Sequence, residues 1–123
     1  MRGVLDIPEN LVAVQDLILD ALARVETRFD GQLASDLPPV DEMCAHIERY
    51  RGKMLRPTLA VLCGAAVRPD LADLLAERAF ERIATEAHVA AGAVCEMVHM
   101  ATLVHDDVLD EAATAALRAE AAR

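Results

Sequence analysis

Three aspartates lie close together in the C-terminal part of the chain, in the order Asp-Asp-x-x-Asp. Asp106, Asp107 and Asp110 come at the end of an apolar run with helical spacing. Residues four apart share one face of a helix, so Asp106 and Asp110 should point the same way. Clustered carboxylates need a counter-charge, and their hard oxygens suit Mg²⁺ that is completed by water and phosphate oxygens. A solvated acidic surface is the alternative, and helical geometry alone does not separate the two.

A histidine precedes the aspartates on the same predicted face. His99 lies seven residues before Asp106, which is nearly two turns, or about 10 Å along a helix. A helix that presents a histidine and then three carboxylates could contact a polyphosphate ligand at both ends of the ligand. Glu96, three residues before His99, could orient the imidazole, but the pattern favours an ordinary solvated glutamate.

Two cations flank a predicted helix start earlier in the chain. Gly52 should free the backbone to turn, and Pro57 suits the first turn of a helix. Lys53 and Arg56 bring a compact charge and a planar fork of donors to that helix end, where the helix dipole also favours anions. Taken alone, such cations are commonly surface charges. Together with the aspartates downstream, they predict a phosphate site.

Both segments resemble signatures of the trans-isoprenyl (polyprenyl) diphosphate synthases, over roughly residues 10–113. Residues 99–111 read His-Met-Ala-Thr-Leu-Val-His-Asp-Asp-Val-Leu-Asp-Glu, similar to the family's first aspartate-rich motif, and residues 51–57 read Arg-Gly-Lys-Met-Leu-Arg-Pro. The resemblance implies head-to-tail condensation of isopentenyl diphosphate with an allylic prenyl diphosphate, dependent on Mg²⁺. The implied metal ligands and catalytic residues are Asp106, Asp107 and Asp110. The implied binding residues for isopentenyl diphosphate are Gly52, Lys53, Arg56 and His99.

The resemblance also has departures. Family members are longer and carry a second aspartate-rich motif that is not found in this sequence. Where the family has two arginines after the first motif, this chain has Ala115 and Ala116, and Arg118 is the nearest cation. A non-catalytic or regulatory subunit of a heteromeric synthase, or an inactive truncated fragment, therefore stands as the alternative. Small residues at Ala101 and Thr102, where short-chain members often have aromatics, imply a long-chain product.

Composition favours helices over sheets. The 123 residues are 54% hydrophobic but only 2% aromatic. We expect an all-α fold with a single domain over residues 1–123, and the resemblance implies the N-terminal half of the antiparallel isoprenoid synthase bundle. The formal net charge is −9, which argues against nucleic acid as a partner.

The apolar pattern predicts the helix boundaries. We expect helices over about 9–29, 41–50, 55–67, 70–80 and 82–112. Asp30-Gly31 should end the first helix, residues 35–39 should form a loop, and Asp70 should cap the fourth helix. The alanine-rich tail from residue 112 to 123 could extend the last helix or fray.

Other features bear on location and assembly. Cys44, Cys63 and Cys95 match neither a disulfide framework nor a zinc site, so we expect buried, reduced thiols in a cytoplasmic protein. We also expect no transmembrane segment, because the longest uncharged run, residues 57–67, is too short to span a bilayer. The long last helix is apolar or small around most of its circumference. We therefore expect a homo- or hetero-oligomer.

Overall fold

The described part of the chain is a small assembly of helices. The computed structural model describes residues 9–34, 36–48 and 52–121, and these contain helices but no strand. The helices are α1 (Glu9–Leu33), α2 (Pro38–Glu48), α3 (Leu55–Ala66), α4 (Leu71–Ala76), α5 (Phe80–Ile83) and α6 (Glu86–Ala121). The prediction of an all-α fold is confirmed.

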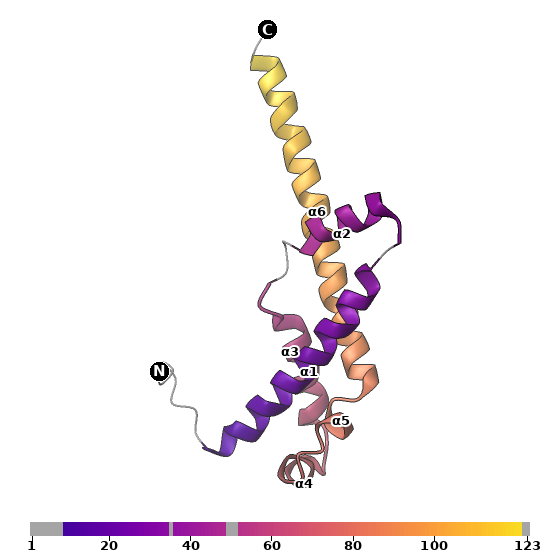
Figure 1. Ribbon diagram of the computed structural model, residues 1–123. Coiled ribbons are helices and arrows are strands. Elements are labelled where there is room, and N and C mark those ends of the chain that lie inside the picture. Colours follow the sequence, from indigo (N-terminus) through magenta and orange to yellow (C-terminus); the bar gives the residue numbers. More distant parts are fainter. Residues whose placement is uncertain (1–8, 35, 49–51, 122–123) are drawn as a thin grey trace, which may run out of the picture.

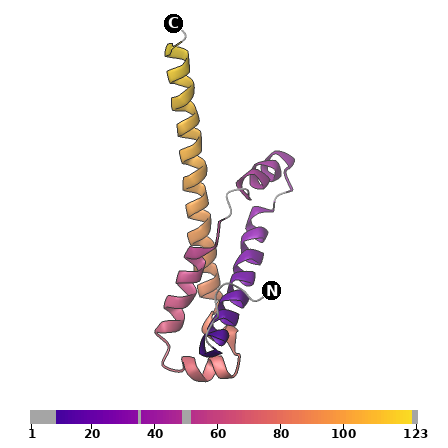
Figure 2. The same ribbon diagram turned by 90° about the vertical axis from the view of Figure 1, so that its left-hand side faces the viewer.

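The core lies where α1 and α3 pack against the first half of α6. Figures 1 and 2 show that α3 runs antiparallel to α1 and α6, with the short α4 and α5 at the base of the bundle. Side chains at helical spacing supply the contacts, because one face of each helix must leave water. The main buried cluster contains Leu17, Ala21, Val61, Ala65, Leu74, Ile83 and Ala84, and a second contains Val25, Val89 and Ala93.

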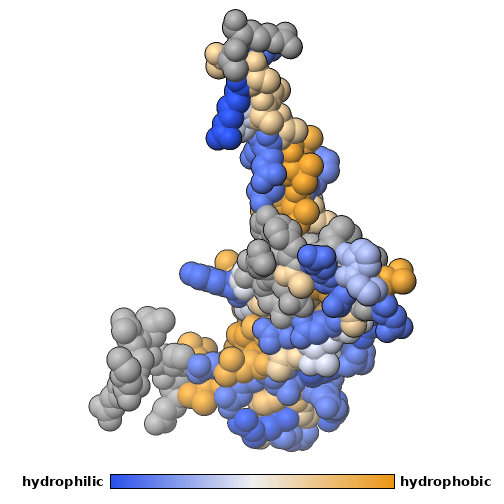
Figure 3. Space-filling view, turned by 45° about the horizontal axis from the view of Figure 1, so that its top comes forward, coloured by the Kyte–Doolittle hydropathy of each residue, from blue (hydrophilic) through white to orange (hydrophobic). Residues whose placement is uncertain are grey.

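The second half of α6 projects beyond the other helices (Figures 1 and 2). Met100 is its last buried residue, and every described residue from 105 to 121 is exposed. Figure 3 shows hydrophobic side chains along one side of this projecting part and hydrophilic ones beside them. The aspartate motif therefore lies on the half of α6 against which no other described helix packs.

Polar contacts fix the start of α6. Arg24 of α1 donates from Nη1 to the carbonyl oxygen of Ala84 and from Nη2 to Oε1 of Glu86, each at 2.7 Å. The backbone N–H of Thr85 donates to Nδ1 of His88 at 3.2 Å. This second contact satisfies a donor at the helix end, in the manner of a capping box. The contacts of Arg24 and of His88 together anchor the start of α6, the helix that carries the aspartates.

Several predicted boundaries were wrong. The first helix continues through Asp30-Gly31 to Leu33, since no described glycine has a positive φ. Pro38 begins α2 instead of closing a loop, because a proline in the first turn lacks only an N–H that has no intrahelical partner there. The predicted second helix ran to residue 50, and residues 49–51 lie outside the described residues. The tail extends α6 to Ala121.

The region from residue 68 to 86 also differs from its prediction. Asp70 precedes α4 but makes no side-chain cap hydrogen bond. It accepts instead from Nε and Nη2 of Arg68, at 3.0 and 2.9 Å. Arg78 then adopts the left-handed conformation (φ 55°), which separates α4 from α5 and delays α6 to Glu86. The single helix expected over 70–80 is therefore two short ones.

The cysteines are free, but the prediction that they are buried was wrong. Cys63 and Cys95 are exposed and Cys44 is half-buried, because the first two lie on the outer faces of α3 and α6. By length and composition α6 could cross a membrane, a test that the core helices of soluble proteins also pass. Composition alone therefore does not decide whether a transmembrane segment exists.

Candidate functional site

The predicted line of polar residues on one helix is present in α6. The helix is continuous from Glu86 to Ala121, so the spacing from His99 to Asp106 and Asp110 keeps these three side chains on one face. His99 is half-buried where α6 leaves the bundle, and Asp106, Asp107 and Asp110 are exposed beyond it. Along α6, the histidine therefore comes first, at the edge of the bundle, and the carboxylates follow on the projecting part.

The start of α3 holds the two predicted cations near the surface. Lys53 and Arg56 are both exposed. The turn depends on Met54, which has φ 55° and ψ 35° and whose carbonyl accepts from the N–H and Oγ1 of Thr58. Gly52 was expected to provide the turn, but the left-handed conformation lies two residues later. The Met54 side chain is 5% exposed, so its burial stabilises a conformation that a non-glycine residue rarely adopts. Arg51 lies outside the described residues.

α3 meets α6 one to two turns before His99. Pro57 packs on Gly92, where an added Cβ would lie 3.2 Å from the Pro57 Cβ. One turn further along α6, Oε2 of Glu96 lies 4.0 Å from Nη1 of Arg56. The helix packing therefore brings Arg56 within a turn of His99, whereas Asp106 lies about 15 Å further along the helix from Glu96.

Glu96 was expected to be an ordinary solvated glutamate, and that prediction was wrong. It is 2% exposed and is the buried charged residue of the described core. The helical pattern did contain the signal. Glu96 lies four residues after Gly92 and four before Met100, both buried, so all three share the face of α6 that packs on α1 and α3.

The aspartates do not enclose a metal site by themselves. No group of three or more His, Cys, Asp or Glu side chains is placed to hold a metal ion within the described residues. The donors nevertheless fit Mg²⁺ chemistry, because they are exposed carboxylates and Mg²⁺ keeps several water or phosphate ligands. Any site here therefore needs oxygens from a ligand, or from another chain segment, to be complete.

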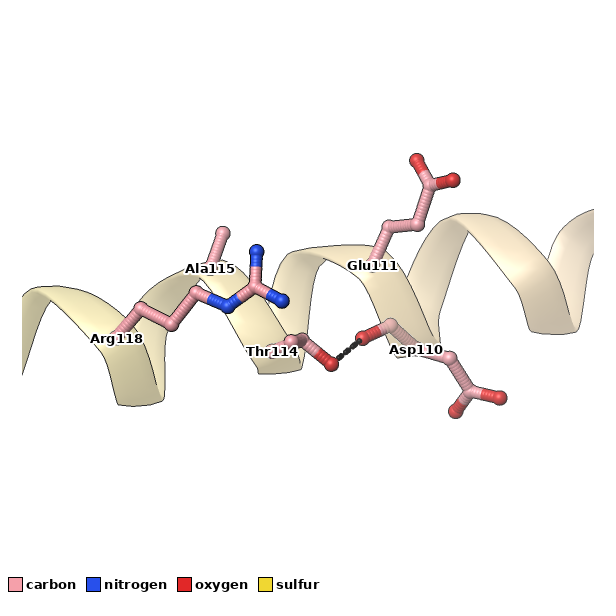
Figure 4. A pocket seen from close by; sticks show the side chains of 5 residues that line it. All are labelled: Asp110, Glu111, Thr114, Ala115 and Arg118. Atoms are coloured by element: carbon pink, nitrogen blue, oxygen red, sulfur yellow. Dashed lines mark hydrogen bonds between the residues drawn. The ribbon is translucent and has the colours of Figure 1, made fainter.

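The hollow beside Asp110 has only one wall. Its volume is about 460 Å³, and its lining consists of Asp110, Glu111, Thr114, Ala115 and Arg118, all from α6. Figure 4 shows the carboxylates of Asp110 and Glu111 on opposite sides of the helix, with Thr114 Oγ1 donating to the carbonyl oxygen of Asp110 at 2.8 Å. The hollow is therefore a surface of mixed charge on α6 that the described helices leave open on its far side.

Comparison with known proteins agrees with these motifs. A sequence model described as polyprenyl synthetase matches residues 38–115. The chain is 34% identical to octaprenyl diphosphate synthase of Escherichia coli K12 over 83% of this chain and 27% of that protein. It is 37% identical to nonaprenyl diphosphate synthase of Mycobacterium tuberculosis, over 85% of this chain and 30% of the relative.

A third relative is named as one component of a synthase. The chain is 34% identical to heptaprenyl diphosphate synthase component 2 of Geobacillus stearothermophilus, over 84% of this chain and 28% of that protein. The chain thus spans little more than a quarter of the length of these curated relatives. No solved structure matches the chain significantly.

Proposed function

The chain belongs to the polyprenyl synthetase family, and on that basis we propose that it supplies part of a prenyltransferase site that condenses isopentenyl diphosphate with an allylic prenyl diphosphate. One observation supports this most strongly. The packing of α3 on α6 places Arg56 within a turn of His99, and the same helix continues to Asp106 and Asp110. Arg56 beside α6, and then His99, Asp106 and Asp110 on α6, thereby follow one another along that helix.

Each set of residues has a distinct role in this proposal. Lys53, Arg56 and His99 bind the diphosphate of isopentenyl diphosphate through charge-assisted hydrogen bonds, which are stronger than neutral ones. Asp106, Asp107 and Asp110 would hold Mg²⁺, which when bound offsets the negative charge that develops on the departing allylic diphosphate. Gly52 carries no side chain and leaves open space beside Lys53.

We further propose a long-chain product. The relatives named above make octaprenyl, nonaprenyl or heptaprenyl diphosphate by name. Ala101 and Thr102 are small and exposed on α6, one turn before the aspartates. A growing apolar tail would meet no bulky side chain at these two positions. Free cysteines are compatible with a cytoplasmic location, which we include in the proposal.

A second candidate is a subunit of a heteromeric synthase, with or without catalytic residues of its own. Two relatives are called component 2 of heptaprenyl diphosphate synthase. The open side of the hollow beside Asp110 also favours a partner, because all five lining residues come from α6. In this case another chain would supply the residues that complete the site.

Incorporation of labelled isopentenyl diphosphate into prenyl products tests both candidates. The chain is assayed alone with Mg²⁺ and an allylic diphosphate, and again with a chain that carries a second aspartate-rich motif. Activity alone supports a self-sufficient enzyme, and activity only in the mixture supports a catalytic subunit. In the mixture, loss of activity on Asp106→Ala and Asp110→Ala substitution separates a catalytic from a regulatory subunit. No effect of this chain on turnover in either assay would overturn the proposal and leave an inactive fragment.

A further inference from the structure

We propose that Glu96 is a positioning residue for Arg56, and that its buried carboxylate holds the guanidinium ready for a diphosphate. This inference rests on the proposed function, because it concerns the same binding site. Nothing in the two sequence signatures assigns a role to Glu96. Its burial and its pairing with Arg56 are properties of the folded chain.

The burial of Glu96 needs an explanation. Its side chain is 2% exposed, and Oε2 has no hydrogen-bond partner among the described residues. A carboxylate removed from water is unfavourable unless a cation or hydrogen-bond donors compensate it. Among the described residues, Arg56 is placed to do so, because its Nη1 lies 4.0 Å from Oε2.

Arg56 faces two environments. Its side chain is 48% exposed, so one side of the guanidinium approaches the buried carboxylate while the rest faces solvent. A guanidinium has five N–H donors in a fixed plane and can serve two acceptor groups at once. At 4.0 Å the pair has charge attraction but is longer than a hydrogen bond. A small rotation of the Arg56 side chain would shorten the distance from Nη1 to Oε2 to that of a hydrogen bond. The guanidinium N–H groups that face solvent would stay available to phosphate oxygens.

The backbone around the pair is fixed by packing. One turn before Glu96, Gly92 lies in close contact with Pro57, the residue after Arg56. The position of the carboxylate is therefore set by the contact between α3 and α6, whereas Arg56 is a long side chain with many rotamers. Holding it before the ligand arrives reduces the conformational entropy lost on binding. Glu96 acts from behind the guanidinium and does not touch the ligand itself.

Binding of inorganic diphosphate and isopentenyl diphosphate to the full chain, measured by titration calorimetry, tests this role. Glu96→Gln keeps the shape of the side chain and removes its charge. We expect it to weaken binding of both ligands about tenfold, because the Arg56 side chain would then lose its conformational freedom only when the ligand arrives. The matched control is Glu26→Gln, the same change at an exposed site on α1. In an Arg56→Gln background, Glu96→Gln should have no further effect, since a positioning residue acts only through the residue it positions.

A measurement without ligand covers the case in which Glu96→Gln fails to fold. In the unaltered chain, the Arg56 Nε–H signal in nitrogen-15 NMR should show slow exchange and restricted motion relative to the exposed Arg118. Equal mobility of these two signals would overturn the proposal. If the unaltered chain binds diphosphate and folded Glu96→Gln binds it equally well, the positioning role alone fails. If the unaltered chain binds neither ligand, alone or mixed with the chain that carries a second aspartate-rich motif, the proposed function fails and the positioning role with it.

Discussion

Pro57 of α3 packs directly against Gly92 of α6. A Cβ added to Gly92 would lie 3.2 Å from the Pro57 Cβ, 3.3 Å from its Cα and 3.3 Å from Cγ2 of Val25 on α1. These neighbours belong to two different helices, so at Gly92 both α1 and α3 lie close to α6. The absence of a side chain at one position thus sets the distance between the elements that carry Arg56 and Glu96.

We predict that Gly92→Leu lowers the free energy of unfolding by about 2 kcal/mol or more, because overpacking forces α1 and α3 away from α6. Chemical denaturation followed by circular dichroism measures this change. Gly31 provides the control, because nothing lies within 4 Å of a Cβ added there. Gly31→Ala should raise stability by up to about 1 kcal/mol, through helix propensity alone. A Gly92→Leu chain as stable as the original would contradict the packing described here.

The ion pair at the start of α6 predicts a pH dependence. The side-chain hydrogen bond from Arg24 lowers the pKa of Glu86 below its ordinary value of 4.5. A lowered pKa in the folded chain means that the unfolded chain binds the proton more tightly. The stabilisation is therefore present above about pH 4.5 and is lost as the pH falls through the lower folded-state value.

Glu86→Gln should remove this part of the acid sensitivity. The difference in denaturation midpoint between pH 7 and about pH 3 should be smaller for Glu86→Gln than for the unaltered chain. Glu26→Gln, the same change at an exposed glutamate of α1 itself, serves as the control and should leave the difference unchanged. Equal pH dependence in all three chains would show that the Arg24–Glu86 contact does not form in solution.

Helical periodicity predicted most of the fold, because each helix buries one face and α6 keeps its spacing over many turns. It placed α3 within one residue at both ends and kept His99, Asp106 and Asp110 on one line. The errors came where tertiary contacts decide the outcome. The αL turn is at Met54 and not Gly52, since burial of the methionine overrides the local preference.

Burial of individual side chains was harder to predict than helix positions. Glu96 is buried and Cys63 and Cys95 are exposed, opposite to their chemical tendencies. Which face of a helix turns inward depends on the partner helices, and the contacts among α1, α3 and α6 fix this. The predicted metal ligation and diphosphate binding of the site residues remain predictions, because the structure fixes only where those residues lie.

For the aspartates, we predict that Mg²⁺ binds weakly alone and more tightly when an allylic diphosphate analogue is present, since the described carboxylates do not enclose an ion. Calorimetry with Mg²⁺, with and without the analogue, measures the difference. Asp106→Ala with Asp110→Ala should abolish the heat of the ternary mixture. Glu111→Ala with Glu120→Ala removes the same charge from the same helix and should retain it. Equal heats for the two double variants would rule out specific ligation.

We predict that a larger side chain at position 101 shortens the product. In the active assembly, Ala101→Phe should shorten the prenyl chains, because the ring fills space that the growing tail requires. Chromatography of the products after dephosphorylation measures their length. Ala119→Phe adds the same ring to an exposed position of α6 well beyond the aspartates and should not change it. Products of unaltered length from Ala101→Phe would show that this position does not line the cavity.

The last prediction concerns the outer face of α6. Val94, Val98 and Val108 are 58%, 59% and 62% exposed. Their spacing of four and ten residues keeps them on one stripe, and the buried Glu96 and Met100 lie on the other side of the helix. An exposed apolar stripe along one side of a helix is a surface that another helix can cover.

We therefore expect the purified chain to associate, either with itself or with a partner that completes the site. Val98→Lys with Val108→Lys should shift the mass measured by light scattering toward the monomer, because two buried charges would oppose the contact. Leu19→Lys with Leu59→Lys introduces the same charges at residues that are 59% and 61% exposed on α1 and α3. That control should leave the mass unchanged. A monomeric unaltered chain that unfolds cooperatively and binds no hydrophobic dye would show that the stripe on α6 needs no covering helix.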